Sequence, residues 1–262
     1  MLTVGIDEVG YGPKFGPLVV AAVAAAGPLP LGIRIADSKR IFSQARGVSS
    51  LEPAVLGFVP AATFAELLER LAIPPLPAPW YAAPLALPSV PRAGRLEAAR
   101  AAFVETSDFN AAATRVNKSE ILFETAAGLI RDLRRDHPGP IRFVVGKQGG
   151  RRFYRKGLER LVAEPVETVE ESRGRSAYRI PGAEIEFLVD AEDRHELVAL
   201  ASMVGKYVRE CAMKLFNDWW AARIEGLRRT AGYGLDARRF WKDIRPHLDG
   251  LGVHPDAVLR LR

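Results

Sequence analysis

The sequence is short of sulfur, of long apolar runs and of the common cofactor motifs. Cys211 is the only cysteine among 262 residues, so no disulfide can form within the chain, and we expect a reducing, cytoplasmic location. No apolar run approaches the roughly 18 residues needed to cross a bilayer, so no membrane partner is expected. The chain also has no Cys/His zinc pattern, no Walker loop and no Gly-x-Gly-x-x-Gly fingerprint. These absences exclude disulfide scaffolds, zinc fingers, P-loop enzymes and Rossmann enzymes.

Apolar residues and positive charge are what the chain does have. Hydrophobic residues make up 48% of it, enough for a sizeable core, and without a repeat or a convincing linker we predict one domain over 1–262. The first residues carry no basic region ahead of an apolar stretch, so no signal peptide is expected. The formal net charge of +6 is compatible with a polyanionic partner, although many basic proteins bind no nucleic acid. We expect a monomer.

Periodicity predicts alternating strands and helices. A strand is expected over 2–7, where every second residue is apolar, and a second buried strand over 17–26 after a glycine-rich reversal. Asp193 and Glu196 resemble a capping box at the start of the longest predicted helix. Helical spacing occurs over 64–71, 119–134 and 197–223, and further strands are expected over 141–145 and, as two or three segments, within 165–190. This alternation predicts an α/β fold.

A proline-rich insertion is predicted at about 73–92. Its seven prolines are incompatible with a helix or a central strand, because proline lacks the backbone N–H that both need. One interpretation is a surface insertion without further role. The other is a flap over a substrate groove, with Trp80 and Tyr81 at its tip.

Two adjacent carboxylates, Asp7 and Glu8, end the first predicted strand. Neighbouring side chains on a strand point to opposite faces, so both can serve one site only where the strand ends, and Gly10 permits a bend there. Oxygen ligands at such a place suit Mg²⁺ or Mn²⁺. The alternative is a pair of solvated carboxylates beside a glycine turn.

Four segments in chain order resemble motifs of the type 2 ribonucleases H, HII and HIII. The opening Asp-Glu pair is followed by Gly-x-Gly and Gly-Pro, and its ending at 15–18 is nearer to HIII. An Asp-Ser-Lys element follows at 37–39, an acidic residue with an Ala-Ser helix at 191–207, and a Gly-Tyr at 232–233. The resemblance implies a ribonuclease H-like mixed sheet with helices on both sides and a helical C-terminal part. HIII's N-terminal substrate-binding domain is expected to be absent, since the motif begins at residue 5.

The resemblance also implies an activity and a set of site residues. The activity is endonucleolytic hydrolysis of the RNA strand of an RNA–DNA hybrid or of a ribonucleotide-containing duplex, with Mg²⁺ or Mn²⁺ as cofactor and 5′-phosphate products. Metal ligands and catalytic carboxylates would be Asp7, Glu8 and Glu192. Substrate contacts would be Gly10, Tyr11, Gly12, Ser38, Lys39, Lys147, Ser202, Lys206 and Tyr233.

Two positions depart from the family pattern. A third carboxylate is expected where the 141–145 strand ends, but Gly146 stands there and carries no ligand. Asp190 is a candidate substitute as catalytic carboxylate and metal ligand, and otherwise the chain is a weakened enzyme or an inactive hybrid-binding protein. Tyr11 occupies the usually basic centre of Gly-x-Gly, whose backbone is the expected sensor of the 2′-hydroxyl.

The motifs disfavour two other classes of protein. A nuclease of the same superfold acting on branched DNA is disfavoured by the Asp-Ser-Lys and Gly-Tyr elements. Sugar-kinase-like folds open with a similar Gly-Ile-Asp strand, but they need a phosphate-binding glycine hairpin with Ser or Thr, which residues 9–13 do not supply.

Overall fold

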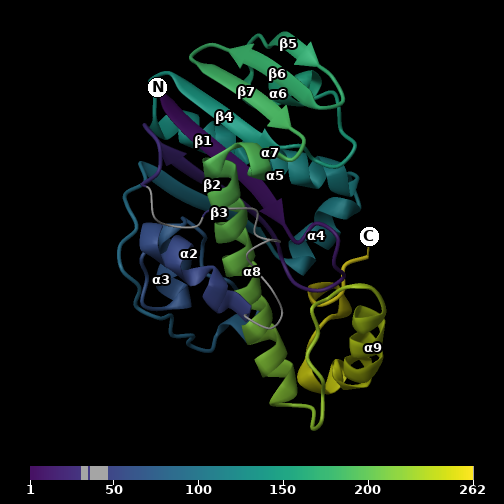
Figure 1. The fold of residues 1–262 in the computed structure, drawn as a ribbon. Helices are drawn as coiled ribbons and strands as arrows, with labels where there is room; N and C mark the ends of the chain where they lie inside the picture. Colours follow the sequence, from purple (N-terminus) through teal and green to yellow (C-terminus); the bar gives the residue numbers. More distant parts are fainter. Residues whose placement is uncertain (31–34, 36–46, 262) are drawn as a thin grey trace.

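A seven-stranded mixed sheet forms the centre of the molecule (Figure 1). The computed structural model describes residues 1–30, 35 and 47–261. The strands lie in the order β3-β2-β1-β4-β7-β6-β5, in which β1, β4 and β7 are parallel neighbours and the remaining pairs are antiparallel. Their bounds are β1 Leu2–Val9, β2 Leu18–Ala25, β3 Ala98–Val104, β4 Ile141–Gly146, β5 Glu167–Glu171, β6 Arg175–Ile180 and β7 Ala183–Leu188.

Strand β2 is buried on both faces of the sheet, as its unbroken run of small apolar residues requires. Val19, Ala21 and Val23 face one hydrophobic cluster, and the alternate residues Val20 and Ala22 face the other. This follows from the two-residue repeat of a strand, which sends successive side chains to opposite faces. The sheet therefore has a core on each side.

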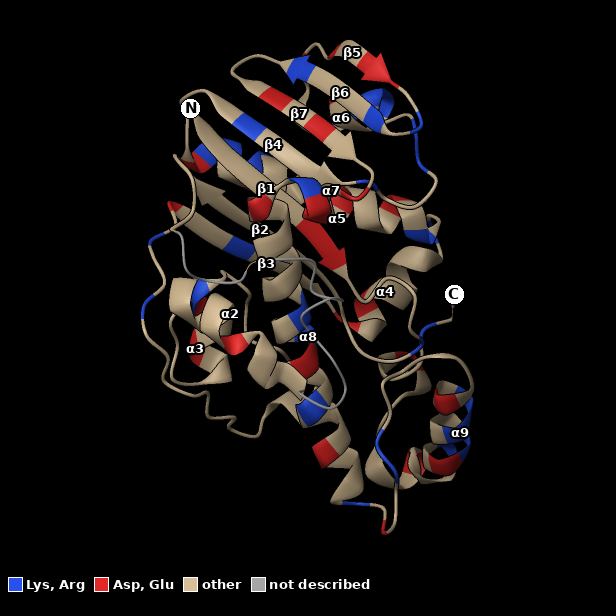
Figure 2. Ribbon diagram, in the orientation of Figure 1, with Lys and Arg blue, Asp and Glu red and all other residues tan. Residues whose placement is uncertain are grey.

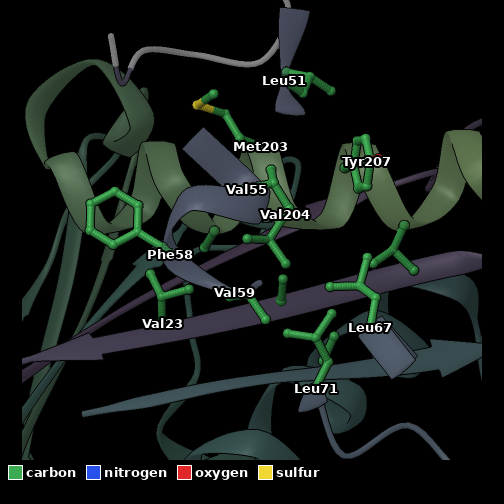
Figure 3. Close-up of a cluster of buried hydrophobic side chains, with 14 of the residues drawn as sticks. Val23, Leu51, Val55, Phe58, Val59, Leu67, Leu71, Met203, Val204 and Tyr207 are labelled. Atoms are coloured by element: carbon green, nitrogen blue, oxygen red, sulfur yellow. The ribbon is translucent and has the colours of Figure 1, made fainter. Parts of the chain in front are cut away.

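The longest helix, α8 (Glu196–Ala221), crosses one face of the sheet over β1 and β2 (Figure 1). Two short helices, α2 (Glu52–Phe58) and α3 (Phe64–Arg70), pack with it on this side, where Val55, Leu67 and Val204 belong to one cluster (Figure 3). The opposite core is covered by α4 (Thr106–Ala113), α5 (Lys118–Asp136) and α6 (Arg155–Val162). Helices thus flank both faces, as expected for a ribonuclease H-like α/β fold.

A third cluster joins the far end of α8 to the C-terminal part of the chain. Helix α9 (Gly234–Ile244) and the short 3₁₀ turns after it pack against Phe216 and Trp220 of α8. The turns span Arg245–His247, Asp249–Leu251 and Pro255–Ala257, and two more lie at Gly47–Ser50 and Pro79–Tyr81. The C-terminal part is helical, as predicted.

The proline-rich segment has one anchored aromatic residue. Between 73 and 92 the structure forms only the Pro79–Tyr81 turn and an isolated bridge from Ala86 to Thr63. Trp80 is only 3% exposed and meets Phe216 and Trp219 edge-on, so its interpretation as the tip of a flap is wrong. The indole binds the segment to α8 instead.

The predicted capping box is also wrong. Asp193 lies inside a short helix, α7 (Ala191–Arg194), and the extended residue His195 separates α7 from α8. No side chain caps the first residue of either helix. Among the described residues, no helix is long and apolar enough to span a membrane.

Candidate active site

The carboxyl ends of the three parallel strands lie side by side. Ile6 of β1 pairs with Val145 of β4, and Gly146 of β4 pairs with Leu188 of β7. Whatever follows these strand ends therefore gathers at one edge of the sheet, the place where open α/β sheets usually bind ligands.

Asp7 and Glu8 reach this edge from opposite faces of β1. Asp7 shares its face with Gly5, which lies directly under the start of α8: a Cβ on Gly5 would meet the Leu197 carbonyl carbon at 2.2 Å. Glu8 shares the other face with Ile6. Burial, and after it the charge of Glu8, raises the pKa of Tyr11 on that face. Burial is also the main reason why the pKa of Tyr154 is raised to about 12, and Glu8 adds to that rise. The strand end lets both carboxylates serve one site.

A pocket of about 390 Å³ opens at this edge and collects most of the predicted site residues. Figure 2 shows acidic residues at the end of β1 and in α7 beside it. Lining residues that the sequence singled out are Asp7, Glu8, Gly10, Lys147, Asp190, Glu192, Ser202, Lys206 and Tyr233. Tyr11 and Gly12 continue the loop from Gly10 without lining the pocket, and Ser38 and Lys39 lie outside the described residues.

Gly146 lies close to both carboxylates of β1. A Cβ built on it would be 2.7 Å from Asp7 Oδ1 and 3.9 Å from Glu8 Oε2. Both oxygens are therefore within 4 Å of one point, the position of the first side-chain atom at residue 146.

Asp190 and Glu192 approach from the end of β7. Asp190 adopts a left-handed conformation (φ 49°) and accepts, through its carbonyl, the Asp193 N–H at the start of α7. Glu192 lies within α7, shortly before α8 begins at Glu196. The turn after β7 thus brings two acidic residues to the pocket that Asp7 and Glu8 line.

The two pocket lysines are held by protein groups. Lys147 Nζ donates to the carbonyl oxygens of Ser172 and Arg173 at 2.7 and 2.9 Å, in the β5–β6 turn. Burial, with the charge of Arg152, lowers its pKa. Lys206 Nζ lies 2.6 Å from Glu210 Oε1, one turn further along α8. Lys147 therefore orders the turn, whereas Lys206 keeps its ammonium at the wall of the pocket.

Several residues at this edge had no signal in the sequence. Lys118, at the start of α5, places its ammonium 4.8 Å from the centre of the Tyr11 ring, so a positive charge stands beside the position where the family motif is basic. Arg209 and Arg260 lie buried beneath the 10–16 loop. Only the pairing of segments distant in the sequence brings these cations here.

The residues at this edge suit a hard divalent cation by chemistry. Carboxylate oxygens are the donors that Mg²⁺ and Mn²⁺ prefer, and those of Asp7 and Glu8 face a common point. Across residues 1–30, 35 and 47–261, however, no group of three or more His, Cys, Asp or Glu side chains is arranged to hold a metal ion. The four-carboxylate ligand set therefore stays a prediction.

The order of the strands and the helices on both faces of the sheet define a ribonuclease H-like α/β fold. Ribonuclease HII from Archaeoglobus fulgidus, solved in complex with PCNA, matches all of this chain and 95% of its own, with a TM-score of 0.54 and 19% identity. Bst-RNase HIII, solved with Mn²⁺, matches all of this chain over 66% of its own, with a TM-score of 0.52 and 17% identity. At these identities the likeness establishes the fold. No family model and no curated protein matches the sequence.

Proposed function

We propose that this chain is a metal-dependent endonuclease that hydrolyses the RNA strand of RNA–DNA hybrids, and that it belongs to the type 2 ribonucleases H. One observation carries the proposal: on a fold shared with ribonucleases HII and HIII, the carboxylates of β1 and α7 line one pocket with Lys206 and Tyr233. The in-order motifs of the sequence support it independently.

Each part of the pocket has a role in this proposal. Bound Mg²⁺ or Mn²⁺ would supply an activated water and stabilise the leaving 3′-oxygen, giving 5′-phosphate products. Asp7, Glu8, Asp190 and Glu192 would hold the metal. Ser202 and Lys206 would face the phosphates, and Tyr233 would pack on the nucleic acid. By their sequence motif, Ser38 and Lys39 would also face the phosphates. The backbone of Gly10, Tyr11 and Gly12 would contact the sugar.

The decisive experiment compares cleavage with binding. Purified protein is incubated with an RNA–DNA hybrid, with a duplex that holds one ribonucleotide, and with DNA alone, first in Mg²⁺ and then in Mn²⁺. Cleavage of the two ribonucleotide-containing substrates, with 5′-phosphate ends, is the expected result. Equal affinity for hybrid and DNA without cleavage would contradict the proposal.

A second candidate function is supported by Gly146. Because this residue places no ligand next to Asp7 and Glu8, the same fold could bind hybrids without cutting them. This alternative predicts preferential binding of hybrid in the cleavage experiment, with no product in either metal.

Asp7→Asn tests the site itself. The substitution removes a charge with little change in volume, so we expect unchanged thermal unfolding but cleavage reduced by roughly 100-fold or more, as when a group that stabilises transition-state charge is lost. Asp249→Asn, in the C-terminal 3₁₀ turn, is the matched control and should cut normally. An Asp7→Asn variant as active as the wild type would place the activity elsewhere.

A further inference from the structure

A buried arginine holds both ends of the loop over residues 10–16. Arg260 is 1% exposed, and its Nη1 and Nη2 atoms donate to the carbonyl oxygens of Gly10 and Gly16, each at 2.6 Å. The guanidinium lies over the Phe109 ring, 4.7 Å from its centre. The planar fork of arginine, with donors at a fixed spacing, suits two carbonyls held side by side.

This arrangement has a cost. Burial, with the nearby charge of Arg209, lowers the pKa of Arg260 to about 9, because the cation is poorly solvated. Replacing a buried ionic group with an apolar side chain of similar size often leaves a protein equally stable or more so. What the guanidinium adds is therefore a defined conformation of the loop.

The bond from Arg260 fixes the direction of one peptide group. The Gly10–Tyr11 peptide is trans, so its C=O and N–H point in opposite directions. Because the Gly10 carbonyl is drawn inward to a buried guanidinium, the Tyr11 N–H of the same peptide points away from Arg260, in the loop that continues from the pocket residue Gly10. Gly10 has a φ of +86°, and a Cβ on it would lie 2.7 Å from Arg209 Nε, so only glycine fits.

A second buried arginine ties the same loop to the tyrosine of the pocket. Arg209 Nη2 donates to the carbonyl oxygens of Phe15 at 3.2 Å and Ala231 at 3.4 Å, and its guanidinium lies 5.5 Å from the centre of the Tyr233 ring. Lys14 N also donates to the Gly232 carbonyl at 2.7 Å. These contacts join the loop to the segment that carries Tyr233.

We propose that Arg260 is a positioning residue, which orients the Gly10–Tyr11 peptide so that the Tyr11 N–H donates to the 2′-oxygen of a ribonucleotide. The inference rests on the proposed function, since it assigns a reader of the sugar to the same pocket. A deoxyribonucleotide has no 2′-oxygen to accept from the Tyr11 N–H. Arg260 therefore sets the preference for hybrid over DNA without touching either nucleic acid.

The test uses Arg260→Lys in the full chain. An ammonium is a single point of charge and cannot hold both carbonyls in place. Affinity for an RNA–DNA hybrid, measured by fluorescence anisotropy without divalent metal, should fall by roughly tenfold, the value of one hydrogen bond at the upper end of its usual range. Affinity for DNA of the same sequence should not change, so the hybrid-to-DNA ratio approaches one.

A second readout needs no substrate. Labelling with ¹⁵N-tyrosine gives amide signals from six tyrosines, of which Tyr11 is identified by Tyr11→Phe. In Arg260→Lys the Tyr11 amide should shift and exchange faster, and in the wild type it should move on addition of hybrid but not of DNA. Asn110→Asp is the substitute if Arg260→Lys does not fold. It removes the donor to the carbonyl of Leu259, the residue before Arg260, at 2.8 Å, and it should give the same changes more weakly.

Arg134→Lys is the matched control. Arg134 also donates to a carbonyl, that of Pro181, but at the opposite edge of the sheet, so this variant should keep the wild-type ratio and Tyr11 signal. An unmoved Tyr11 amide or an unchanged ratio in Arg260→Lys overturns the inference while leaving the proposed function intact. A wild-type protein that neither cuts hybrid nor prefers it to DNA overturns the proposed function, and the sugar-reading role falls with it.

Discussion

Position 146 decides how complete the carboxylate cluster is. Gly146 ends β4 next to Asp7 and Glu8, and its backbone is outside the left-handed region, so an ordinary side chain could stand there. Without a ligand at that point, two divalent cations would repel each other with one negative charge fewer to compensate, and binding of the second should weaken most. Any cleavage should accordingly favour Mn²⁺, which binds such ligands more tightly than Mg²⁺.

Gly146→Asp should increase cleavage of hybrid. The new carboxylate would stand next to those of Asp7 and Glu8, and Asp7 must turn slightly, since its Oδ1 would lie 2.7 Å from the added Cβ. We expect a gain of about tenfold, which corresponds to about 1.4 kcal/mol of transition-state stabilisation, and a smaller difference between Mg²⁺ and Mn²⁺. The measurement is the initial cleavage rate in each metal.

Asp190→Asn tests the competing assignment, in which Asp190 already supplies the third ligand. Asparagine tolerates the left-handed backbone at this residue, so the substitution removes only charge. If Asp190 fills the role, this variant loses activity and Gly146→Asp gains little. Should neither variant change the cleavage rate, both assignments of the third ligand are wrong.

Glu105 predicts a pH dependence of stability. Its side chain is buried, and burial, helped by the charge of Asp108, raises its pKa from about 4.5 to about 7. Between these values the folded chain binds a proton that the unfolded chain has released, so the free energy of unfolding should fall as pH rises from about 4.5 to about 7. Glu105→Gln should remove this decline and stabilise the protein at pH 8 by up to roughly 3 kcal/mol.

Urea unfolding of wild type and Glu105→Gln from pH 4 to pH 8 is the measurement. Asp108→Asn should weaken the decline without removing it, because burial is the larger cause of the raised pKa. Parallel pH profiles in wild type and Glu105→Gln would show that another group is responsible.

At the scale of elements, the pattern of apolar residues predicted much of the sheet and three of the helices. Strand β1 and helices α3, α5 and α8 follow from their periodicity, and strands β2 and β4 follow from apolar runs that are buried almost throughout. Strand β3 was missed, since only Ala101 in it is buried and Arg100 interrupts the apolar residues. The break at His195 was missed because Asp193 and Glu196 imitate a cap, whereas α7 ends at Arg194 and His195 is extended.

Gly5 and Gly128 should respond in opposite ways to alanine. A Cβ on Gly5 would meet backbone atoms of Leu197 and Val198 within 2.5 Å, so Gly5→Ala must push α8 away from β1 and destabilise the fold by about 1–3 kcal/mol. Gly128 lies inside α5 with nothing within 4 Å of an added Cβ, and Gly128→Ala should stabilise by about 1 kcal/mol. Thermal unfolding of both variants is the check, and a Gly5→Ala variant of wild-type stability would contradict the close packing of α8.

At the scale of the whole molecule, a site residue could be predicted from the sequence only where it belongs to a local motif. Asp7, Glu8, Lys206 and Tyr233 belong to local motifs, and the structure brings them to one pocket. Lys118 beside Tyr11 and Arg260 beneath the 10–16 loop follow only from the packing of distant segments, which no local pattern records. The sequence therefore predicted the groups at the pocket, but not those that orient them.

Salt dependence tests the charge of the molecule as a whole. With a net charge of +6, binding of hybrid should weaken steeply as salt rises, because each phosphate contact releases a counterion and contributes roughly −0.9 to the log–log slope on a duplex. Affinities between about 50 and 200 mM salt supply the slope. A flat response would show that the positive charge does not meet phosphates.

The hold of Arg260 on the 10–16 loop also has a consequence for the order of events during synthesis. Arg260 follows Gly10 by 250 residues and Gly16 by 244, so a ribosome makes the loop long before the side chain that fastens its two ends. A growing polypeptide, still attached to its messenger RNA, displays the loop without its anchor. We expect such a nascent chain to bind nucleic acid without discriminating ribose from deoxyribose, and to gain that discrimination only after residue 260 has emerged from the exit tunnel.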